Sequence, residues 1–413
     1  MFNCIMNRLK IIIFSCFVAL LLVLNNLMFT HEHAEITDVE DMVNHDIVSP
    51  QKLVDETFEI IHDNYYDRSM NHQNWNRWKY RYHNKIKTAE DARVAIDTML
   101  ASLNDPYSRF MSKEEYLDQN TSIKSKITGI GVNITSESGK VKIVNVVENT
   151  PAQFSNVLPD DIIINIDGKD VNGLSIAEVA DLVKGPENTF VQITLLRNND
   201  KIVKNIMRKE IKVKTVKSSV DKNIGYIQIK TFIGSTTPNE FLEALEKTKE
   251  TKALIIDLRG NTGGLLPNAV FIANLFIPKG NIVSIVGRNG YKYSIDAQNT
   301  EFSVNKPLVV LVDGTSASAS EILSGALKDY HKAILVGSRT FGKGMVQKII
   351  PMPNETGINL TIAKYLTPNG HDINNKGIEP DVNVEFSIKD INNKTDSQMN
   401  TAKQILNKMI ASN

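Results

Sequence analysis

The fold is decided by the run Pro307-Leu308-Val309-Val310-Leu311-Val312-Asp313-Gly314-Thr315-Ser316-Ala317-Ser318-Ala319-Ser320-Glu321-Ile322. Its first six residues form a continuous apolar stretch, as in a strand that is covered on both faces of a sheet. The Asp-Gly-Thr triplet that follows supplies turn chemistry. From Glu321 onward, apolar residues recur at helical spacing. The run therefore predicts a buried strand, a tight turn and a helix, which is the repeating unit of an α/β fold.

Three alternating serines, Ser316, Ser318 and Ser320, lie where this helix is expected to begin. Free backbone N–H groups and the helix dipole favour negative charge at such a position. A hydroxyl at Ser318 would be placed to attack a carbonyl, and the amide of Ala319 to hold an oxyanion. The alternative is that the three serines only cap the helix. The residues alone do not decide which of the three serines would be the nucleophile, or whether they only cap the helix.

Lys343 is the candidate base for such a serine. Residues 332–336 predict a second buried strand, and the glycine-flanked loop after it leads into Lys343. A serine hydroxyl is a weak nucleophile until a base takes its proton. Lysine is a base only when neutral, so its pKa must fall from about 10.4 towards neutrality. Burial between Phe341 and Met345 would have that effect, whereas the alternative is an ordinary solvated lysine.

Other chemistries fit the same residues less well. Residues 337–343 spell G-x-x-x-x-G-K after a strand, but Gly344 stands where a P-loop needs Ser or Thr, which disfavours nucleotide binding. The eight histidines form no HExxH motif and have no cysteine partners, so we expect neither a metal nor another cofactor. Asp329 and His331 are close in sequence, but polar residues at a helix end are usually solvated, which disfavours a Ser-His-Asp triad.

The blocks at residues 316–322 and 340–347 resemble those of the carboxyl-terminal processing peptidases, also called tail-specific proteases. These are serine endopeptidases with a Ser/Lys dyad and a PDZ domain. The resemblance extends over residues 53–384. Further matching blocks are Asp105-Pro106-Tyr107-Ser108, Gly225-Tyr226-Ile227, residues 257–264, residues 366–370 and residues 376–381.

The resemblance assigns roles to residues of this chain. It implies that Ser318 is the nucleophile, that Lys343 is the general base and that Gln347 supports the lysine. Acidic residues that assist in some members correspond to Glu321 and Asp329. The preference for Ser318 over the two neighbouring serines comes from this resemblance.

A glycine-rich loop offers a second group of backbone donors. Residues 253–258 predict a buried strand, and residues 265–276 a helix with Pro267 in its first turn. The loop between them contains Gly260, Gly263 and Gly264, which can adopt positive φ and bring bare backbone close to a ligand. The resemblance implies that this loop supplies an oxyanion-hole amide, at Gly263 or Gly264. A plain turn is the alternative.

Residues 127–196 resemble a PDZ domain. Strands are expected at residues 141–147 and 161–166, and a helix at residues 175–183. Gly129, Ile130, Gly131 and Val132 stand where such domains carry their carboxylate-binding loop. A peptide with a free C-terminus would add as a strand while loop amides hold its carboxylate. The alternative is a small β module that binds nothing.

The N-terminus differs from the rest of the chain. Arg8 and Lys10 precede an apolar run at residues 11–24, which predicts a secretory signal or, as we favour, an uncleaved anchor extending to residue 29. The positive flank places the rest of the protein on the non-cytoplasmic, periplasmic side of the membrane. Both cysteines, Cys4 and Cys16, fall in this segment, so the exported body has no thiol. The 47 basic and 47 acidic side chains balance, which disfavours a nucleic-acid partner.

We therefore expect an α/β protein with a crotonase- or ClpP-like protease core, an inserted PDZ domain and helical terminal regions. We expect the signal or anchor at residues 1–30 and the N-terminal helical region at residues 31–120. The PDZ domain is expected at residues 121–205, the protease core at residues 206–388 and the helical tail at residues 389–413. The expected activity is cleavage near the C-terminal tails of exported or membrane proteins, through an acyl-enzyme. The resemblance implies a homodimer or higher homo-oligomer formed by terminal helices. The alternative is an inactive, membrane-tethered PDZ scaffold.

Overall fold

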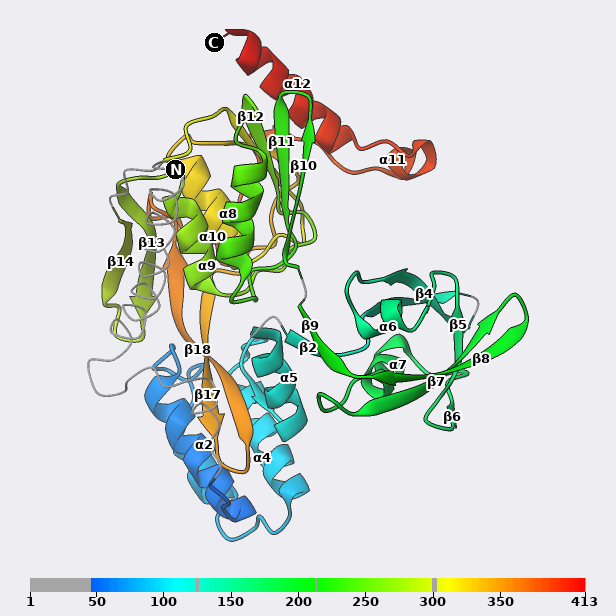
Figure 1. Ribbon diagram of the computed structural model, residues 1–413. Coiled ribbons are helices and arrows are strands. Elements are labelled where there is room, and N and C mark those ends of the chain that lie inside the picture. The colour runs from blue at the N-terminus through cyan, green and yellow to red at the C-terminus, as the bar shows by residue number, and fades with distance from the viewer. Residues whose placement is uncertain (1–45, 124–125, 138, 213, 299–302, 413) are drawn as a thin grey trace, which may run out of the picture. The chain divides into compact units, whose positions relative to one another are not determined.

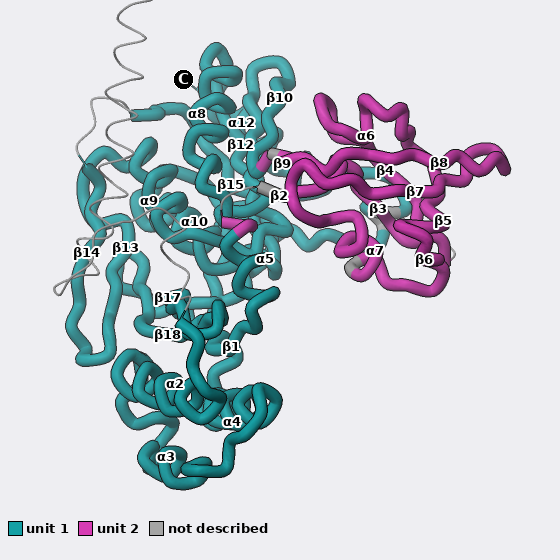
Figure 2. The backbone as a smooth tube through the Cα atoms, turned by 60° about the horizontal axis from the view of Figure 1, so that its bottom comes forward, with its two compact units in different colours: residues 1–120, 215–413 teal, residues 121–214 magenta. Residues whose placement is uncertain are grey.

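The computed structural model describes residues 46–123, 126–137, 139–212, 214–298 and 303–412. The chain forms two compact units (Figure 2), one of residues 1–120 with 215–413 and the other of residues 121–214. The second unit is thus an insertion in the first. The segment expected as a PDZ domain, residues 121–205, lies within the second unit.

The first unit is organised around a six-stranded sheet (Figure 1). Its strand order is β10 (Val216–Asp221), β11 (Ile224–Ile229), β12 (Ala253–Asp257), β15 (Leu308–Val312), β16 (Ile334–Gly337) and β19 (Val382–Asn383). β10 and β11 pair antiparallel, and every other neighbouring pair is parallel. The carboxyl ends of β12, β15 and β16 therefore meet at one edge of the sheet. The predicted buried strands are confirmed.

Helices cover both faces of this sheet. α8 (Thr237–Lys247), α9 (Leu266–Asn274) and α10 (Ala319–Asp329) pack on one face. α12 (Ser397–Ser412), which follows the short α11 (Ile388–Asn393), packs on the other with Ala402 and Leu406 fully buried. Alternate residues of β15 belong to the two cores, as expected for a strand covered on both faces. The predicted helical tail thus packs apolar side chains against its own chain.

A second sheet connects the core to the N-terminal helices. It has the order β1 (Arg109–Met111), β18 (Thr356–Leu366), β13 (Gly280–Gly287) and β14 (Lys292–Ala297), and β17 (Met345–Met352) also pairs with β18. α2 (Pro50–Asn64), α3 (Arg77–Arg81) and α4 (Ala89–Ser102) pack together against the distal ends of β17 and β18 (Figure 1), and α5 (Lys113–Ile123) follows β1. Trp75 and Trp78 are buried in this cluster, so these two aromatic side chains pack against their own chain. The arrangement holds the turn before β1 against β18.

The inserted unit is a small β module with its own core. Its main sheet has the order β3 (Val132–Glu137), β4 (Lys140–Val146), β5 (Ile162–Ile166), β7 (Phe190–Arg197) and β8 (Asp200–Met207), with β6 (Lys169–Asp170) beside β5. The first and last strands of the unit, β2 (Lys126–Gly129) and β9 (Lys209–Lys212), pair with each other in a separate two-stranded sheet. Its helices are α6 (Pro151–Phe154) and α7 (Ile176–Val183). A capping box of Ser175 and Glu178 starts α7. The strands and helix predicted here are present.

The predicted signal or anchor segment, residues 1–30 with its expected anchor at residues 11–29, lies outside the described residues. Within the described ranges, no helix is both long and apolar enough to cross a bilayer.

Candidate active site

Three loops meet at the carboxyl edge of the central sheet. The loop after β12 contains Gly263, the turn after β15 contains Ser318, and the loop after β16 leads to Lys343. These three strands are neighbours in the order β12-β15-β16 and run in the same direction. Open α/β sheets bind their ligands at such an edge. The topology therefore brings together residues that are 80 positions apart in sequence.

The backbone of Ser318 sets it apart from the two other serines. Its φ of 55° and ψ of −115° are strained for a non-glycine residue, and it is half-buried where the turn enters α10. Ser316 and Ser320 are fully buried, and their hydroxyls donate to the carbonyls of Leu258 and Asn261 at 2.9 Å. Those two hydroxyls therefore hold the turn together, whereas the strained turn presents Ser318.

Gly263 approaches this turn so closely that no side chain fits there. A Cβ atom on Gly263 would lie 2.8 Å from the Ser318 Cβ and 2.7 Å from the Ala317 carbonyl oxygen, and its φ is 104°. The Gly263 amide donates to Asn261 Oδ1 at 2.9 Å. The bridge between this loop and Phe232 uses the Gly263 carbonyl and the Leu265 amide. Two amides are predicted for the oxyanion hole, those of Gly263 and Gly264. The Gly263 amide is already hydrogen-bonded within its own loop.

The carboxylate of Glu321 ties the serine turn to the lysine loop. Glu321 is fully buried, and its Oε2 accepts hydrogen bonds from the backbone amides of Ser318 and Lys343, both at 2.9 Å. Its Oε1 accepts from the Thr340 hydroxyl at 2.6 Å and from the Gly342 amide at 2.7 Å. Because both amide nitrogens contact one oxygen, they lie no farther apart than twice 2.9 Å. Glu321, for which only an assisting role is predicted, thus links the serine turn to the lysine loop.

The side chain of Lys343 lies in a largely desolvated position. Burial lowers the pKa of its ammonium group, and the negative charges of Asp105 and Glu321 partly oppose that effect. The Nζ atom lies 4.8 Å from the centroid of the Tyr107 ring. Phe341, which was expected to bury the lysine, is 56% exposed. The apolar cover comes instead from a distant segment of the chain.

The remaining predicted residues separate into two groups. Gln347 lies on β17 beyond the lysine, and its Nε2 donates to the Thr361 hydroxyl at 3.3 Å. Asp329 ends α10, roughly 16 Å along the helix from Ser318 at 1.5 Å per residue. Its carboxylate accepts from the Asn369 amide at 2.8 Å, which fastens a surface turn. The structure therefore does not bring Asp329 to the other site residues.

In the inserted unit, the residues predicted to bind a carboxylate lie together at the start of β3. Gly129 ends β2, Ile130 is buried, and Gly131 has a φ of 88° before Val132 begins β3. A Cβ on Gly131 would lie 2.4 Å from Thr150, which explains the glycine. α7 packs beside β3. This places the loop at the head of the edge where a peptide strand would add.

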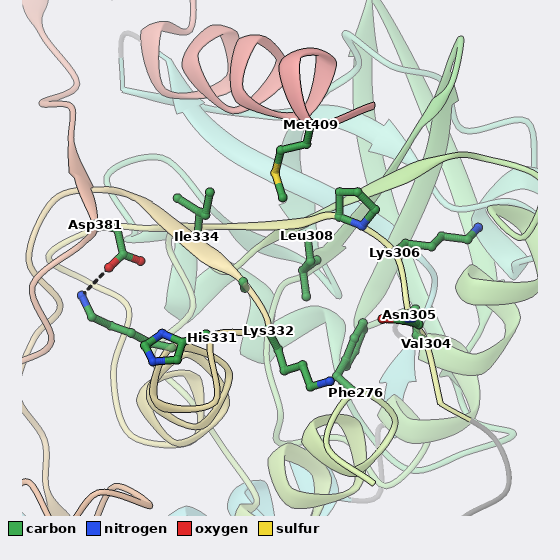
Figure 3. Close-up of a pocket in the computed structure, with 13 residues that line it drawn as sticks. Phe276, Val304, Asn305, Lys306, Leu308, His331, Lys332, Ile334, Asp381 and Met409 are labelled. Carbon is green, nitrogen blue, oxygen red and sulfur yellow. Dashed lines mark ion pairs between the residues drawn. The ribbon is translucent and has the colours of Figure 1, made fainter. Parts of the chain in front are cut away.

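A cavity of about 550 Å³ lies at the opposite edge of the central sheet. Figure 3 shows that it is lined by the first residues of β15 and β16 and by Met409 of α12. Lys306 donates to the carbonyls at the end of α8, and Lys328 forms an ion pair with Asp381 at 2.9 Å. These lysines therefore stabilise the fold, and the cavity is a strand length away from Ser318. In the part of the chain that the structure describes, no acidic, histidine or cysteine cluster is arranged to hold a metal.

Comparison with known proteins agrees with this geometry. The model of peptidase family S41 matches residues 223–384, and that of the PDZ domain matches residues 128–207. The chain is 36% identical over 371 residues to the carboxyl-terminal-processing protease of Synechocystis sp., covering 86% of each chain. The chain belongs to the carboxyl-terminal processing proteases of family S41. It is therefore a serine-type peptidase with a PDZ domain.

Two further relatives support the family and the fold. The carboxy-terminal-processing protease of Bartonella bacilliformis is 40% identical over 299 residues, which cover 70% of this chain and 69% of the relative. The solved structure of a photosystem II D1 C-terminal processing protease aligns with a TM-score of 0.55 at 30% identity, covering 82% of this chain and 94% of the other. The predicted α/β protease core with a PDZ domain is thus confirmed.

Sequence reasoning missed several groups of this S41 site. The sequence patterns assign no role to Tyr107, whose ring lies over the lysine amine. They assign none to Tyr365 either, which is buried and donates to the Ser318 carbonyl at 3.2 Å. Thr340 has no role in the sequence patterns, although it is the first residue of the block at 340–347. Its hydroxyl donates to Glu321 and accepts from the Ile378 amide. None of these residues follows a spacing rule, because each reaches the site from a different strand or loop.

Proposed function

We propose that this protein is an endopeptidase that cleaves near the C-termini of exported or membrane proteins with a Ser318/Lys343 dyad. Neutral Lys343 takes the proton of the Ser318 hydroxyl, and the serine oxygen attacks the scissile carbonyl. The lysine then returns the proton to the leaving amine, which leaves an acyl-enzyme. Water, deprotonated by the same lysine, hydrolyses the ester and regenerates the serine.

The oxyanion of each tetrahedral intermediate needs preorganised donors. The amide of Ala319 is the first helical amide after the nucleophile, and its nitrogen would lie 3.0 Å from a Cβ on Gly263. We assign the second donor to Gly264, because the Gly263 amide already donates to Asn261. Removing one such donor typically costs about 10²–10³-fold in turnover.

The observation on which this proposal chiefly rests is the position of Glu321. One buried oxygen accepts from the backbones of both Ser318 and Lys343, so the proposed nucleophile and base belong to one rigid unit. The lowered pKa of Lys343 supports its role as a base, since burial favours the neutral amine. Gln347 would orient the amine from β17.

Substrate selection is assigned to the PDZ unit. The loop of residues 129–132 would hold the terminal carboxylate, and the peptide would extend β3. We further propose that residues 11–29 anchor the protein in the cytoplasmic membrane with its body on the non-cytoplasmic side. Self-association through terminal helical regions remains an expectation, measurable by analytical ultracentrifugation of the full chain.

The test is cleavage of an unfolded protein by the full chain in detergent, compared with Ser318→Ala and Lys343→Ala. Each variant should lose on the order of 10⁴-fold or more in kcat/KM, and intact mass measurement should detect an acyl adduct only when Ser318 is present. Amidating the substrate's C-terminus should raise KM. Undiminished cleavage by Lys343→Ala would refute the dyad, and cleavage by neither wild type nor variants would favour an inactive PDZ scaffold.

A further inference from the structure

The turn before β1 reaches the lysine loop from the N-terminal helical region. Asp105 organises this turn, because its carboxylate accepts from the Tyr107 amide at 2.9 Å and from the Ser108 hydroxyl at 2.6 Å. The Ser108 oxygen in turn accepts from the Thr361 amide on β18 at 3.0 Å. The turn is therefore fixed to the same strand that Gln347 contacts.

The aromatic ring of Tyr107 lies over the amine of Lys343. Its centroid lies 4.8 Å from Nζ, within the range of a cation–π interaction. Tyr107 is itself half-buried, and burial raises the pKa of its phenol, as do the charges of Asp105 and Glu321. The phenol thus remains neutral, and its ring lies over the amine.

Three groups act on the lysine from two elements. Glu321 approaches from α10, and Asp105 and Tyr107 from the turn before β1. Tyr365 of β18 contacts the serine turn, because its hydroxyl donates to the Ser318 carbonyl. Burial raises the pKa of Tyr365 well above its usual value, so it contributes no charge. The negative charges that act on the Lys343 amine are those of Asp105 and Glu321.

A lysine base has two conflicting requirements. It must be neutral before it takes the serine proton and stable as an ammonium ion afterwards, and efficiency is greatest when its pKa is near the working pH. Desolvation alone serves only the first requirement. An aromatic face and a nearby carboxylate serve the second, because both attract the ammonium form.

We propose that Tyr107 and Asp105 are positioning residues of the proteolytic site, which complete the lysine pocket from the N-terminal helical region and hold the ammonium form of Lys343. The turn also reaches the glutamine, because Asp105, Ser108, Thr361 and Gln347 form a continuous series of hydrogen bonds. The N-terminal helices would then influence activity through this turn. The inference rests on the proposed dyad.

Substitutions of Tyr107 separate the ring's electrostatic effect from its bulk. Tyr107→Phe keeps the aromatic face, so the titration midpoint of Lys343 should match that of the wild type. Tyr107→Leu keeps apolar bulk but removes the π-system, which should lower the midpoint by roughly 0.4 to 1.5 pH units. Tyr107→Ala should admit water and raise it. Tyr80→Leu, an exposed residue of the same helical region, is the matched control.

Asp105→Asn tests the charge. The amide keeps an oxygen for the Tyr107 amide but loses the negative charge that favours the ammonium ion, so the midpoint should move to lower pH. Asp97→Asn removes an exposed carboxylate of α4 and is its matched control. Far-ultraviolet circular dichroism and thermal melting establish that each variant is folded, and Asp105→Asn remains informative where a Tyr107 variant fails to fold.

The midpoint is best measured without catalysis. In the full chain carrying Ser318→Ala, brief acetylation at a series of pH values, followed by mass spectrometry of the Lys343 peptide, reports the neutral fraction of that amine. This measurement is valid whether or not the protein cleaves peptides, so it can fail independently of the proposed function. Downward shifts in Tyr107→Leu and Asp105→Asn, with none in either control, would support the proposal. Wild-type midpoints in both variants, or an upward shift in Asp105→Asn, would overturn it.

In the active chain, the acid limb of kcat/KM should move with the acetylation midpoint. A purely structural role would lower kcat without moving that limb.

Discussion

Replacing Glu321 with glutamine tests the centre of the site with the smallest change of shape. Glu321 Oε1 and Oε2 accept two hydrogen bonds each, and all four donors belong to the turns of Ser318 and Lys343. Glutamine keeps one acceptor oxygen and turns an NH₂ group towards the other two donors. If the oxygen keeps Thr340 and Gly342, the amides of Ser318 and Lys343 lose their partner.

The magnitude follows from those two lost acceptors. Leaving one buried donor unsatisfied costs about 1–3 kcal/mol, so Glu321→Gln should lower the free energy of unfolding by about 2–6 kcal/mol. The serine and lysine turns would also separate, and a 1 Å misplacement typically costs about 10²-fold in turnover. We therefore expect a large loss of kcat together with an earlier urea midpoint.

The assay combines urea denaturation with peptide hydrolysis, and labelling by a fluorophosphonate reports whether Ser318 still reacts. Glu246→Gln, which alters an exposed carboxylate paired with Lys249, is the control and should change neither quantity measurably. Wild-type stability and turnover in Glu321→Gln would show that this carboxylate does not hold the two turns together, and our account of the site would be wrong.

The remaining predictions address the glycine loop, the lysine and the inserted unit. Gly263→Ala should reduce turnover by about 10²-fold, because its Cβ would meet the Ser318 turn; Gly290→Ala, which has positive φ but open space, controls for backbone strain, and equal activity of the two would contradict the close approach. Lys343→Met should flatten the rise of stability with pH: burial lowers the folded-state pKa, so the unfolded chain binds a proton that the folded chain releases between that pKa and about 10.4. Urea midpoints at pH 7 and pH 10 measure this rise, and the same slope in both proteins would exclude a buried amine. Asp161→Ala should destabilise the inserted unit by about 1–3 kcal/mol, because it leaves the Leu158 amide without its acceptor and removes the ion-pair partner of the partly exposed Arg197; hydrogen exchange of residues 121–214 in the full chain should increase there first, and unchanged protection would contradict the prediction.

The S41 site shows why a serine peptidase of this kind is built at a sheet edge. Parallel strands deliver their loops to one edge, so the glycine loop, the proposed nucleophile Ser318 and the proposed base Lys343 need no direct sequence proximity. The strain at Ser318 is held by the buried bonds around it, in particular those of Ser316, Ser320 and Glu321. Such strain persists only where the surrounding structure over-determines it.

The sequence by itself determined the elements and the chemistry of their loops. Local patterns sufficed for this: the continuous apolar run before Ser318, the glycines after β12 and the helical spacing after Glu321 are short-range signals that neighbouring residues supply. Resemblance then selected Ser318 among the three serines and matched Lys343 as its base.

Only the tertiary structure decided which serine is presented, what covers the lysine and which carboxylate matters. The hydroxyls of Ser316 and Ser320 are occupied by hydrogen bonds to a loop about 60 residues earlier, which leaves Ser318 as the candidate nucleophile. Tyr107 reaches Lys343 from the N-terminal region. Asp329 lies at the far end of α10, away from Ser318. Burial, desolvation and hydrogen bonding of a side chain depend on segments remote in sequence, so no local pattern encodes them.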